Sequence, residues 1–335
     1  MGGATCDVKE NRQTPLTPLA KVAYRVFNNR VVETFIVAVI AVCVLSTAVI
    51  DGILGTRTKR KLIESLRSVS RDKLSGLRKA QIRYVFRCKF GLSRIRIRLA
   101  GGSYWLSIPC IIEGRKDGRD VKYMAKIVNG MSAIKHRYMT MLRNLGVAAG
   151  AMDMRFDEYE DAKEMASFER YCLTKLRDEQ VSAPAVIGMF RLNEDDYMLV
   201  MEFIEGMPLS EVPVDNSMLD QVFQDIRTMH DHGFVHGDIK LDNFLVSGGK
   251  IFVLDCLKVG YSAFQAAKSF DTICALCAMC QKVPVDRVVG QARKYFSDDE
   301  LLQAGKLLDV AVSKVDIELS DNKVRELRRA LGNPV

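Results

Sequence analysis

The stretch Val235-His236-Gly237-Asp238-Ile239-Lys240-Leu241-Asp242-Asn243-Phe244 decides the fold class of this chain. It places an Asp, a Lys two residues later and an Asn three residues beyond the Lys. An apolar, strand-like run at 250–254 then ends in a second carboxylate, Asp255. Two carboxylates, an amide and a cation are the groups that phosphoryl transfer needs to orient a hydroxyl, hold Mg²⁺ and steady the moving phosphoryl group. A polar turn between two strands is the simpler alternative, but it leaves the spacing of the whole set unexplained.

This pattern, His-x-Asp-x-Lys-x-x-Asn followed twelve residues after the Asn by Asp, resembles the catalytic and metal-binding loops of the protein-kinase-like superfamily. The resemblance implies an α+β, bilobal fold, with a small antiparallel β-sheet in the N-lobe and a mainly helical C-lobe. It implies ATP and Mg²⁺ as cofactors. Asp238 would orient the acceptor hydroxyl, and Lys240 would stabilise the transferring phosphoryl group. Asn243 and Asp255 would bind Mg²⁺.

Upstream residues resemble the nucleotide-binding strands of the same superfamily. The strand predicted at 121–128 contains Ala125-Lys126, so Lys126 would bridge the α- and β-phosphates. The preceding turn at 100–103 retains Gly102 at only one of the positions expected for glycine, and a plain hairpin turn is an equal alternative. The helix predicted at 157–179 offers Glu169 as the partner of Lys126, with Glu164 as the second choice.

The apolar strand at 197–206 resembles the hinge that presents backbone groups to adenine. Met201 would line the adenine pocket, and Glu202 and Ile204 would offer their main-chain groups. A buried strand without a ligand would have the same composition, so this assignment depends on the catalytic loop that follows it.

Charge and cysteine usage narrow the class of protein further. The formal net charge of +8 is uneven, because residues 1–100 hold 20 Lys/Arg against 6 Asp/Glu and the remaining residues hold 29 against 35. The catalytic part is therefore not a basic nucleic-acid binder, and no nucleic-acid partner is expected. The nine cysteines have no disulfide-scaffold spacing, which favours a reducing compartment. Cys274, Cys277 and Cys280 lie in an apolar run that predicts a buried helix rather than a metal cluster.

A hydrophobic segment near the N-terminus predicts membrane attachment. Residues 35–50 carry no charge, and the stretch 35–54 is long enough to span a bilayer, although a buried helix or an uncleaved signal sequence would also be apolar. Residues 56–90 hold 12 Lys/Arg against 2 Asp/Glu, which places the C-terminal side in the cytoplasm. The predicted order is a tail (1–34), a single membrane helix (35–54), a basic juxtamembrane helix (55–92), an N-lobe (93–204) and a C-lobe (205–335). The basic helix would lie on anionic lipid, or would be a solvated charged helix.

Two departures from regulated protein kinases indicate the acceptor. Gly237 stands where those enzymes carry an Arg, and only fifteen residues separate Asp255 from Asp271, with no Ala-Pro-Glu between them. Glycolipid, small-molecule and RIO-type kinases share both traits. Residues 195–275 are similar to the bacterial kinases of lipopolysaccharide-core heptose. The resemblance therefore implies a sugar hydroxyl of a membrane glycolipid as acceptor, near Lys258 and Lys268. An atypical RIO-like serine/threonine protein kinase is the alternative, and a pseudokinase scaffold is a third reading.

Overall fold

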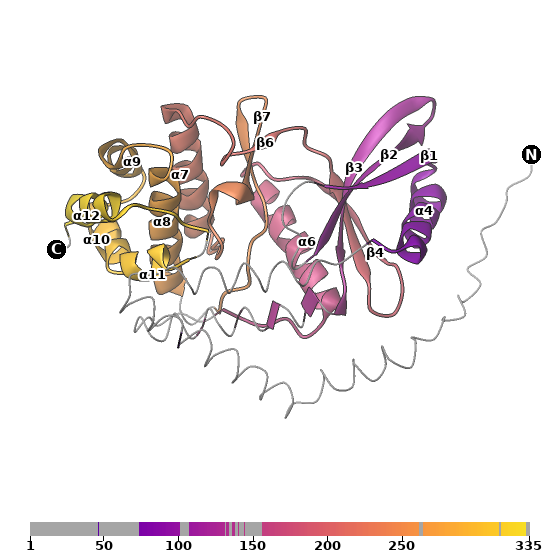
Figure 1. Cartoon of the computed structure of the whole chain (residues 1–335), viewed down its shortest axis with the longest axis horizontal. Helices are drawn as coiled ribbons and strands as arrows, with labels where there is room; N and C mark the ends of the chain where they lie inside the picture. Colours follow the sequence, from indigo (N-terminus) through magenta and orange to yellow (C-terminus); the bar gives the residue numbers. More distant parts are fainter. Residues whose placement is uncertain are drawn as a thin grey trace, which may run out of the picture.

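The computed structural model describes residues 46, 74–100, 107–130, 132–133, 136–137, 140, 144, 156–260, 264–314 and 316–332. In this part of the chain a β-sheet lies at one end and a group of helices at the other, with helix α6 between them (Figure 1). We call the sheet with α4 and α6 the N-lobe, and everything from β6 onward the C-lobe. This α+β arrangement, with an antiparallel sheet and a helical part, is the one expected from the resemblance.

The N-lobe sheet is antiparallel throughout and has the strand order β1-β2-β3-β5-β4. Its strands are β1 (Ser93–Leu99), β2 (Ile108–Lys116), β3 (Arg119–Val128), β4 (Val186–Arg191) and β5 (Tyr197–Glu202). Strands β2 and β3 stay paired as far as Lys116 and Arg119, so only two residues form the turn between them. Asp117 and Gly118 both have positive φ, which is the geometry that a tight two-residue hairpin requires.

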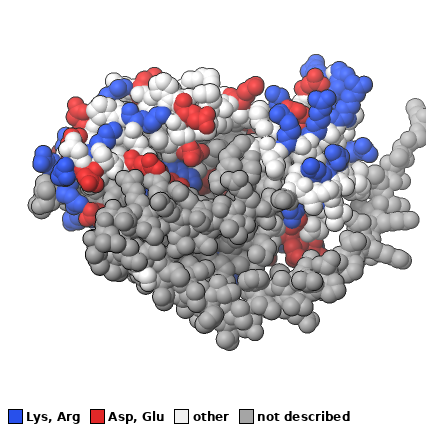
Figure 2. Space-filling model, in the orientation of Figure 1, with Lys and Arg blue, Asp and Glu red and all other residues white. Residues whose placement is uncertain are grey.

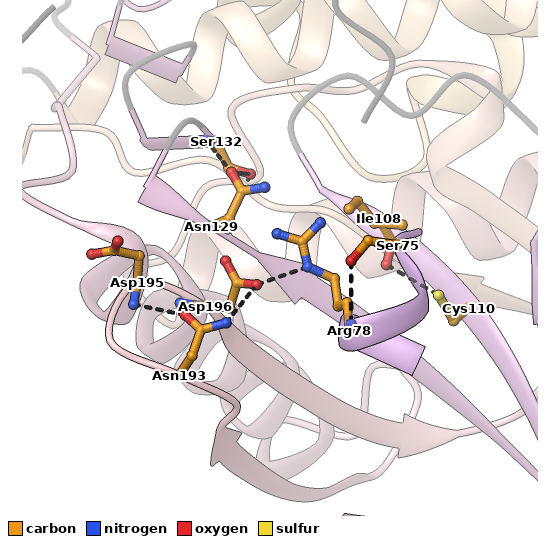
Figure 3. Close-up of polar contacts among 9 residues, drawn as sticks. All are labelled: Ser75, Arg78, Ile108, Cys110, Asn129, Ser132, Asn193, Asp195 and Asp196. Atoms are coloured by element: carbon orange, nitrogen blue, oxygen red, sulfur yellow. Dashed lines mark hydrogen bonds and ion pairs between the residues drawn. The ribbon is translucent and has the colours of Figure 1, made fainter. Parts of the chain in front are cut away.

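Helix α4 (Gly76–Phe90) is an integral part of the N-lobe. Its Ile82 and Phe86 are fully buried in one cluster with side chains of β2, β3 and β5. The Arg78 guanidinium donates to the Asp196 carboxylate at 2.7 Å, which ties α4 to the turn between β4 and β5 (Figure 3). The predicted boundary at 92, between the juxtamembrane helix and the N-lobe, therefore separates two elements that share a core. The helix assigned to the juxtamembrane region packs on the sheet.

Helix α6 (Ala162–Asp178) positions the acidic partner of the site. It begins later than the helix predicted at 157–179, because the Asp161 side chain accepts from the Glu164 amide and caps its N-terminus. Its buried face packs against β3, β4 and β5. Glu169 lies on that face, one turn before Cys172, and only 9% of it is exposed.

The C-lobe combines a small sheet with a helical core. Its elements are β6 (Met207–Pro208), α7 (Asn216–Asp231), the 3₁₀ turn η1 (Leu241–Asn243), β7 (Phe244–Ser247), β8 (Lys250–Val253), α8 (Phe264–Cys280), α9 (Val285–Ala292), α10 (Asp298–Gly305), α11 (Leu308–Val312) and α12 (Asp321–Ala330). Cys274, Cys277 and Cys280 of α8 are all fully buried free thiols, as the buried-helix prediction requires. Helix α8 also contains Asp271, two turns after its first residue, Phe264.

Several predictions lie outside the described residues: the tail 1–34, the segment 35–54 apart from residue 46, the basic stretch up to 73, and Gly102. Among the helices that the structure does describe, none combines the length and the hydropathy needed to cross a bilayer.

Candidate active site

The site lies where the two lobes meet, and Lys126 of β3 joins them. Its ammonium donates to the Glu169 carboxylate of α6 at 2.7 Å and also contacts the Asp255 carboxylate, which follows β8. The side chains of Lys126 and Glu169 are 15% and 11% exposed, whereas that of Asp255 is 48% exposed. The structure thus brings together three predicted site residues that are far apart in the sequence.

The pKa values of Lys126, Glu169 and Asp255 are shifted because one cation is shared by two acids. Burial opposes the charge of Lys126, but the Asp255 and Glu169 carboxylates together raise its pKa above the usual range. Burial raises the pKa of Glu169, although Lys126 counteracts the effect. Burial also works against the charged form of Asp255, but Lys126 and Lys240 hold the pKa of that carboxyl below its usual range. Lys126 therefore stays charged, and Asp255 stays ionised and able to bind a cation.

The catalytic loop is held by Asp271, a fully buried residue of α8. Its two carboxylate oxygens accept from the backbone amides of His236 and Gly237 at 2.6 and 2.9 Å. These two bonds hold the backbone of the loop that carries Asp238. The buried ring of His236 accepts from the Asp238 amide at 3.2 Å, and burial lowers the pKa of His236. A neutral imidazole can accept that hydrogen bond, whereas an imidazolium cannot.

Gly237 is required by the local backbone. Its φ is +78°, and a Cβ there would lie 3.1 Å from both Leu257 and Val259. An Arg at this position would meet both the strained φ and these neighbours. The structure therefore gives a steric reason for the glycine that stands where regulated protein kinases carry Arg.

Asp238 lies between two lysines. Its Oδ2 atom is 3.4 Å from Lys240, and its Oδ1 atom is 3.3 Å from Lys314. The Lys314 ammonium is also 3.3 Å from the Ile239 carbonyl oxygen and lies over the Phe270 ring. Asp238 raises the pKa of Lys240, which keeps that cation charged. Sequence reasoning missed Lys314 because it comes from the loop after α11, outside the matched motifs, and only the tertiary fold brings it here.

Asn243 and Asp255 are the residues predicted to hold Mg²⁺ with a nucleotide. The Asn243 amide nitrogen donates to the Asp238 carbonyl at 2.8 Å, which leaves its side-chain oxygen as the group for a cation. The Leu254 amide donates to the Asn243 carbonyl, so the two segments that carry the oxygens lie side by side. Among the described residues no three His, Cys, Asp or Glu side chains gather into a metal site. Mg²⁺ typically takes one or two protein ligands and completes its shell with phosphates and water, so this sparse donor set fits.

In the predicted hinge, one backbone hydrogen bond limits which groups Glu202 could offer to adenine. Met201 is buried in β5, and Glu202 ends that strand. The Glu202 amide donates to the Ala185 carbonyl at 2.8 Å, so the backbone group that Glu202 could offer to adenine is its carbonyl. Ile204 follows β5 and is half-buried. The roles of these three residues remain predictions.

Glu164, the second choice as partner of Lys126, lies elsewhere. Its carboxylate pairs with Lys258 at 2.9 Å, near the start of α6. Lys268 lies over the Phe264 ring, with its ammonium 5.3 Å from the ring centre. Lys258 and Lys268 are thus engaged within the C-lobe and at its border with α6. A role in holding an acceptor remains a prediction for both.

Comparisons with known proteins match the segment that contains this site. The RIO domain family model matches residues 126–268. Lipopolysaccharide core heptose(II) kinase WaaY of Escherichia coli is 32% identical over 73 residues, which is 22% of this chain and 32% of WaaY. KEOPS complex subunit Bud32 of Pyrococcus abyssi is 29% identical over 99 residues, covering 28% of this chain and 44% of Bud32. Serine/threonine-protein kinase PrkC of Bacillus subtilis is 30% identical over 114 residues, covering 30% of this chain and 17% of PrkC.

The chain spans less than half the length of each of these relatives. A solved structure of Rad53 in complex with AMP-PNP aligns with a TM-score of 0.37 and 16% identity, covering 71% of this chain and 60% of that one. The RIO-domain match begins at Lys126 and encloses Asp238, Asn243 and Asp255 in the geometry described above. The site geometry and these matches therefore support a protein-kinase-like superfamily for this chain, with relatives among RIO-domain proteins and the heptose kinase WaaY.

Proposed function

We propose that this protein is an ATP-dependent phosphotransferase with a hydroxyl acceptor. The observation that carries the proposal is the convergence of Lys126, Glu169 and Asp255 at the junction of the lobes, beside a catalytic loop that Asp271 holds in place. A scaffold without activity would need none of these charged groups brought together at the cost of burying them. This argument favours an enzyme over the pseudokinase reading.

Each residue of the site has a task in this reaction. Lys126, anchored by Glu169, would bind the α- and β-phosphates. Asn243 and Asp255 would hold Mg²⁺, which supplies charge neutralisation between the phosphates when it is bound. Asp238 would accept a hydrogen bond from the acceptor hydroxyl and take its proton, and Lys240 would stabilise the transferred group.

The acceptor that we propose is a sugar hydroxyl of a membrane glycolipid. Only residues 256–263 separate Asp255 from α8, and the described part of this segment, 256–260, is attached to the chain before α6. The Asp157 amide donates to the Lys258 carbonyl at 3.1 Å, and Phe156 pairs with Val259. A short, pinned segment offers little surface for an extended peptide, which supports a compact acceptor. The similarity to WaaY, a heptose kinase by name, supports the same choice.

A RIO-like protein kinase is the second candidate. The RIO-domain match covers the whole segment from Lys126 to Lys268, and the WaaY match covers fewer residues. Bud32 is matched at comparable identity, so the comparisons favour neither acceptor class alone.

Radiolabel transfer from γ-³²P-ATP separates the candidates. The purified full chain would be incubated with Mg²⁺ and either the glycolipid fraction of the source cells or casein and myelin basic protein. We expect label in glycolipid that is absent with Asp238→Ala. Label in serine or threonine of protein, with none in glycolipid, would establish the RIO-like alternative, and no transfer to any acceptor would refute the phosphotransferase.

We also propose that residues 35–54 anchor the chain in a membrane, with both lobes in the cytoplasm. The apolar stretch and its following cations support this orientation. The full chain should remain in the membrane fraction after washing with about 1 M salt, which shortens charge attraction to about 3 Å. A chain that lacks residues 1–55 should be released by that wash. Release of the full chain as well would exclude a spanning segment.

A further inference from the structure

Helix α4 carries an unusual outer surface for a helix that packs on a sheet. Its inner side buries Ile82 and Phe86, so its outer side should be polar. Instead Leu77 and Tyr84, seven residues apart and therefore on one side of the helix, are 61% and 62% exposed. Cys88, one turn after Tyr84, is exposed as well.

The same helix is strongly cationic. It contains five Lys and Arg residues and no acidic residue. Arg78 alone of these forms an ion pair within the described residues, with Asp196. Arg87 and Lys89 are in the last turn, where cations favour the helix dipole. That effect does not account for Arg83, which repels Arg87 across one turn, nor for the exposed apolar side chains. We call the surface formed by Leu77, Arg83, Tyr84, Arg87 and Cys88 the outer arc of α4.

The surroundings of the outer arc extend the positive charge. Residues 74–122 hold 12 Lys/Arg against 3 Asp/Glu. Lys and Arg side chains gather at the end of the molecule formed by α4 and strands β1 to β3, at the upper right of Figure 2. Residues 123–335 hold 25 Lys/Arg against 32 Asp/Glu, so the charge belongs to this end of the molecule.

We propose that the outer arc of α4 docks the N-lobe on an anionic lipid surface. Exposed apolar side chains beside unneutralised arginines are the combination that inserts at the headgroup boundary while pairing with lipid phosphates. A nucleic acid would also attract the cations, but its phosphates provide no apolar contact for Leu77. The inference rests on the membrane association proposed above, and it is independent of the phosphotransferase activity.

Cys88 makes the surface directly measurable in the full chain. Cys6→Ser and Cys43→Ser leave Cys88 as the exposed thiol, because the other described cysteines are buried. Burial also raises the pKa of Cys110, Cys274 and Cys280 to about 12, so these thiols react slowly. An environment-sensitive fluorophore on Cys88 would then be followed during titration with vesicles of phosphatidylcholine alone or with phosphatidylglycerol added.

The expected result is a blue shift with anionic vesicles and none with neutral vesicles, even where the neutral vesicles capture the chain. Arg83→Glu with Arg87→Glu should raise the anionic lipid needed for the shift by at least about tenfold, since each cation near the surface contributes about 1 kcal/mol. Arg325→Glu with Arg329→Glu is the matched control, because these exposed arginines have the same spacing on α12. It should leave the titration unchanged.

Three outcomes overturn the inference. If the emission of the fluorophore on Cys88 does not change with anionic vesicles, the outer arc does not contact lipid. Equal weakening by the α12 control shows that only net charge matters. A shift with transfer RNA but not with anionic vesicles assigns the surface to nucleic acid. Vesicle capture itself, measured by co-sedimentation, reports separately on the anchor at 35–54, and radiolabel transfer reports separately on the activity.

Discussion

Replacing Asp271 with Ala should lower both the stability of the fold and the rate of phosphotransfer. The fully buried carboxylate accepts from the His236 and Gly237 amides, and hydrogen bonds to a charged group contribute about 1.5–3 kcal/mol each. The variant should therefore lose about 3–6 kcal/mol. For a folded domain of about 250 residues each kcal/mol corresponds to about 2–4 °C in Tm, so the midpoint should fall by about 6–24 °C.

Thermal unfolding of the full chain in detergent, followed by circular dichroism, measures this loss. Asp220→Ala is the matched control, because Asp220 bonds Lys294 and Tyr295 near the surface and such pairs contribute at most about 1 kcal/mol. Below the lowered midpoint, kcat should also fall, since the loop that carries Asp238 has lost its anchor. A decrease in Tm for Asp271→Ala no larger than that for Asp220→Ala would refute the assigned role.

Two further predictions concern the site, and a third concerns Asp225, a buried acid of α7. Asp255→Ala and Asp238→Ala should each lower kcat by on the order of 10²–10⁴, but only Asp255→Ala should weaken Mg-ATP binding in calorimetry. Lys314→Ala should lower kcat by up to about 10² through misplacement of Asp238, with ATP KM unchanged and partial rescue by Lys314→Arg; full activity in steady-state assays would make Lys314 incidental. Burial raises the pKa of Asp225 from 3.8 to about 7, so the folded chain holds a proton that the unfolded chain releases, and stability falls as pH rises between these values. Asp225→Asn should therefore gain a few kcal/mol over the parent at pH 8 and little near pH 4, and equal Tm differences at both pH values would contradict this.

The parts of the site that the sequence could predict are those with local spacing. The catalytic loop, Asp255 and the strand carrying Lys126 follow from short patterns, because their positions are set by neighbouring residues in one turn or strand. The resemblance favours Glu169 over Glu164, and the structure pairs Glu169 with Lys126 at 2.7 Å. The sequence could narrow the choice to one helix, whereas the pairing itself depends on how α6 packs on the sheet.

The parts that it could not predict depend on tertiary contacts. Lys314 reaches Asp238 only because α11 packs against α8, and no short pattern encodes that contact. The packing of α4 on the sheet could not be predicted for a different reason. Cations dominate the composition of α4, and only Ile82 and Phe86 are buried. A helix with so few buried positions has the same pattern as a surface helix. The short β2–β3 turn could have been recognised from Asp117-Gly118, which favours a two-residue hairpin.

The inclusion of α4 in the N-lobe sets the length of the tether between the folded domain and the proposed anchor. With the anchor ending at 54 and α4 beginning at Gly76, 21 residues connect them. Even fully extended they reach about 70 Å, since each residue adds at most about 3.3–3.6 Å. The catalytic centre would therefore stay close to the bilayer. There the effective concentration of acceptors in the membrane is raised. Lengthening this connection, with the domain and the anchor unchanged, should lower the effective concentration of acceptor without altering the chemistry at Asp238.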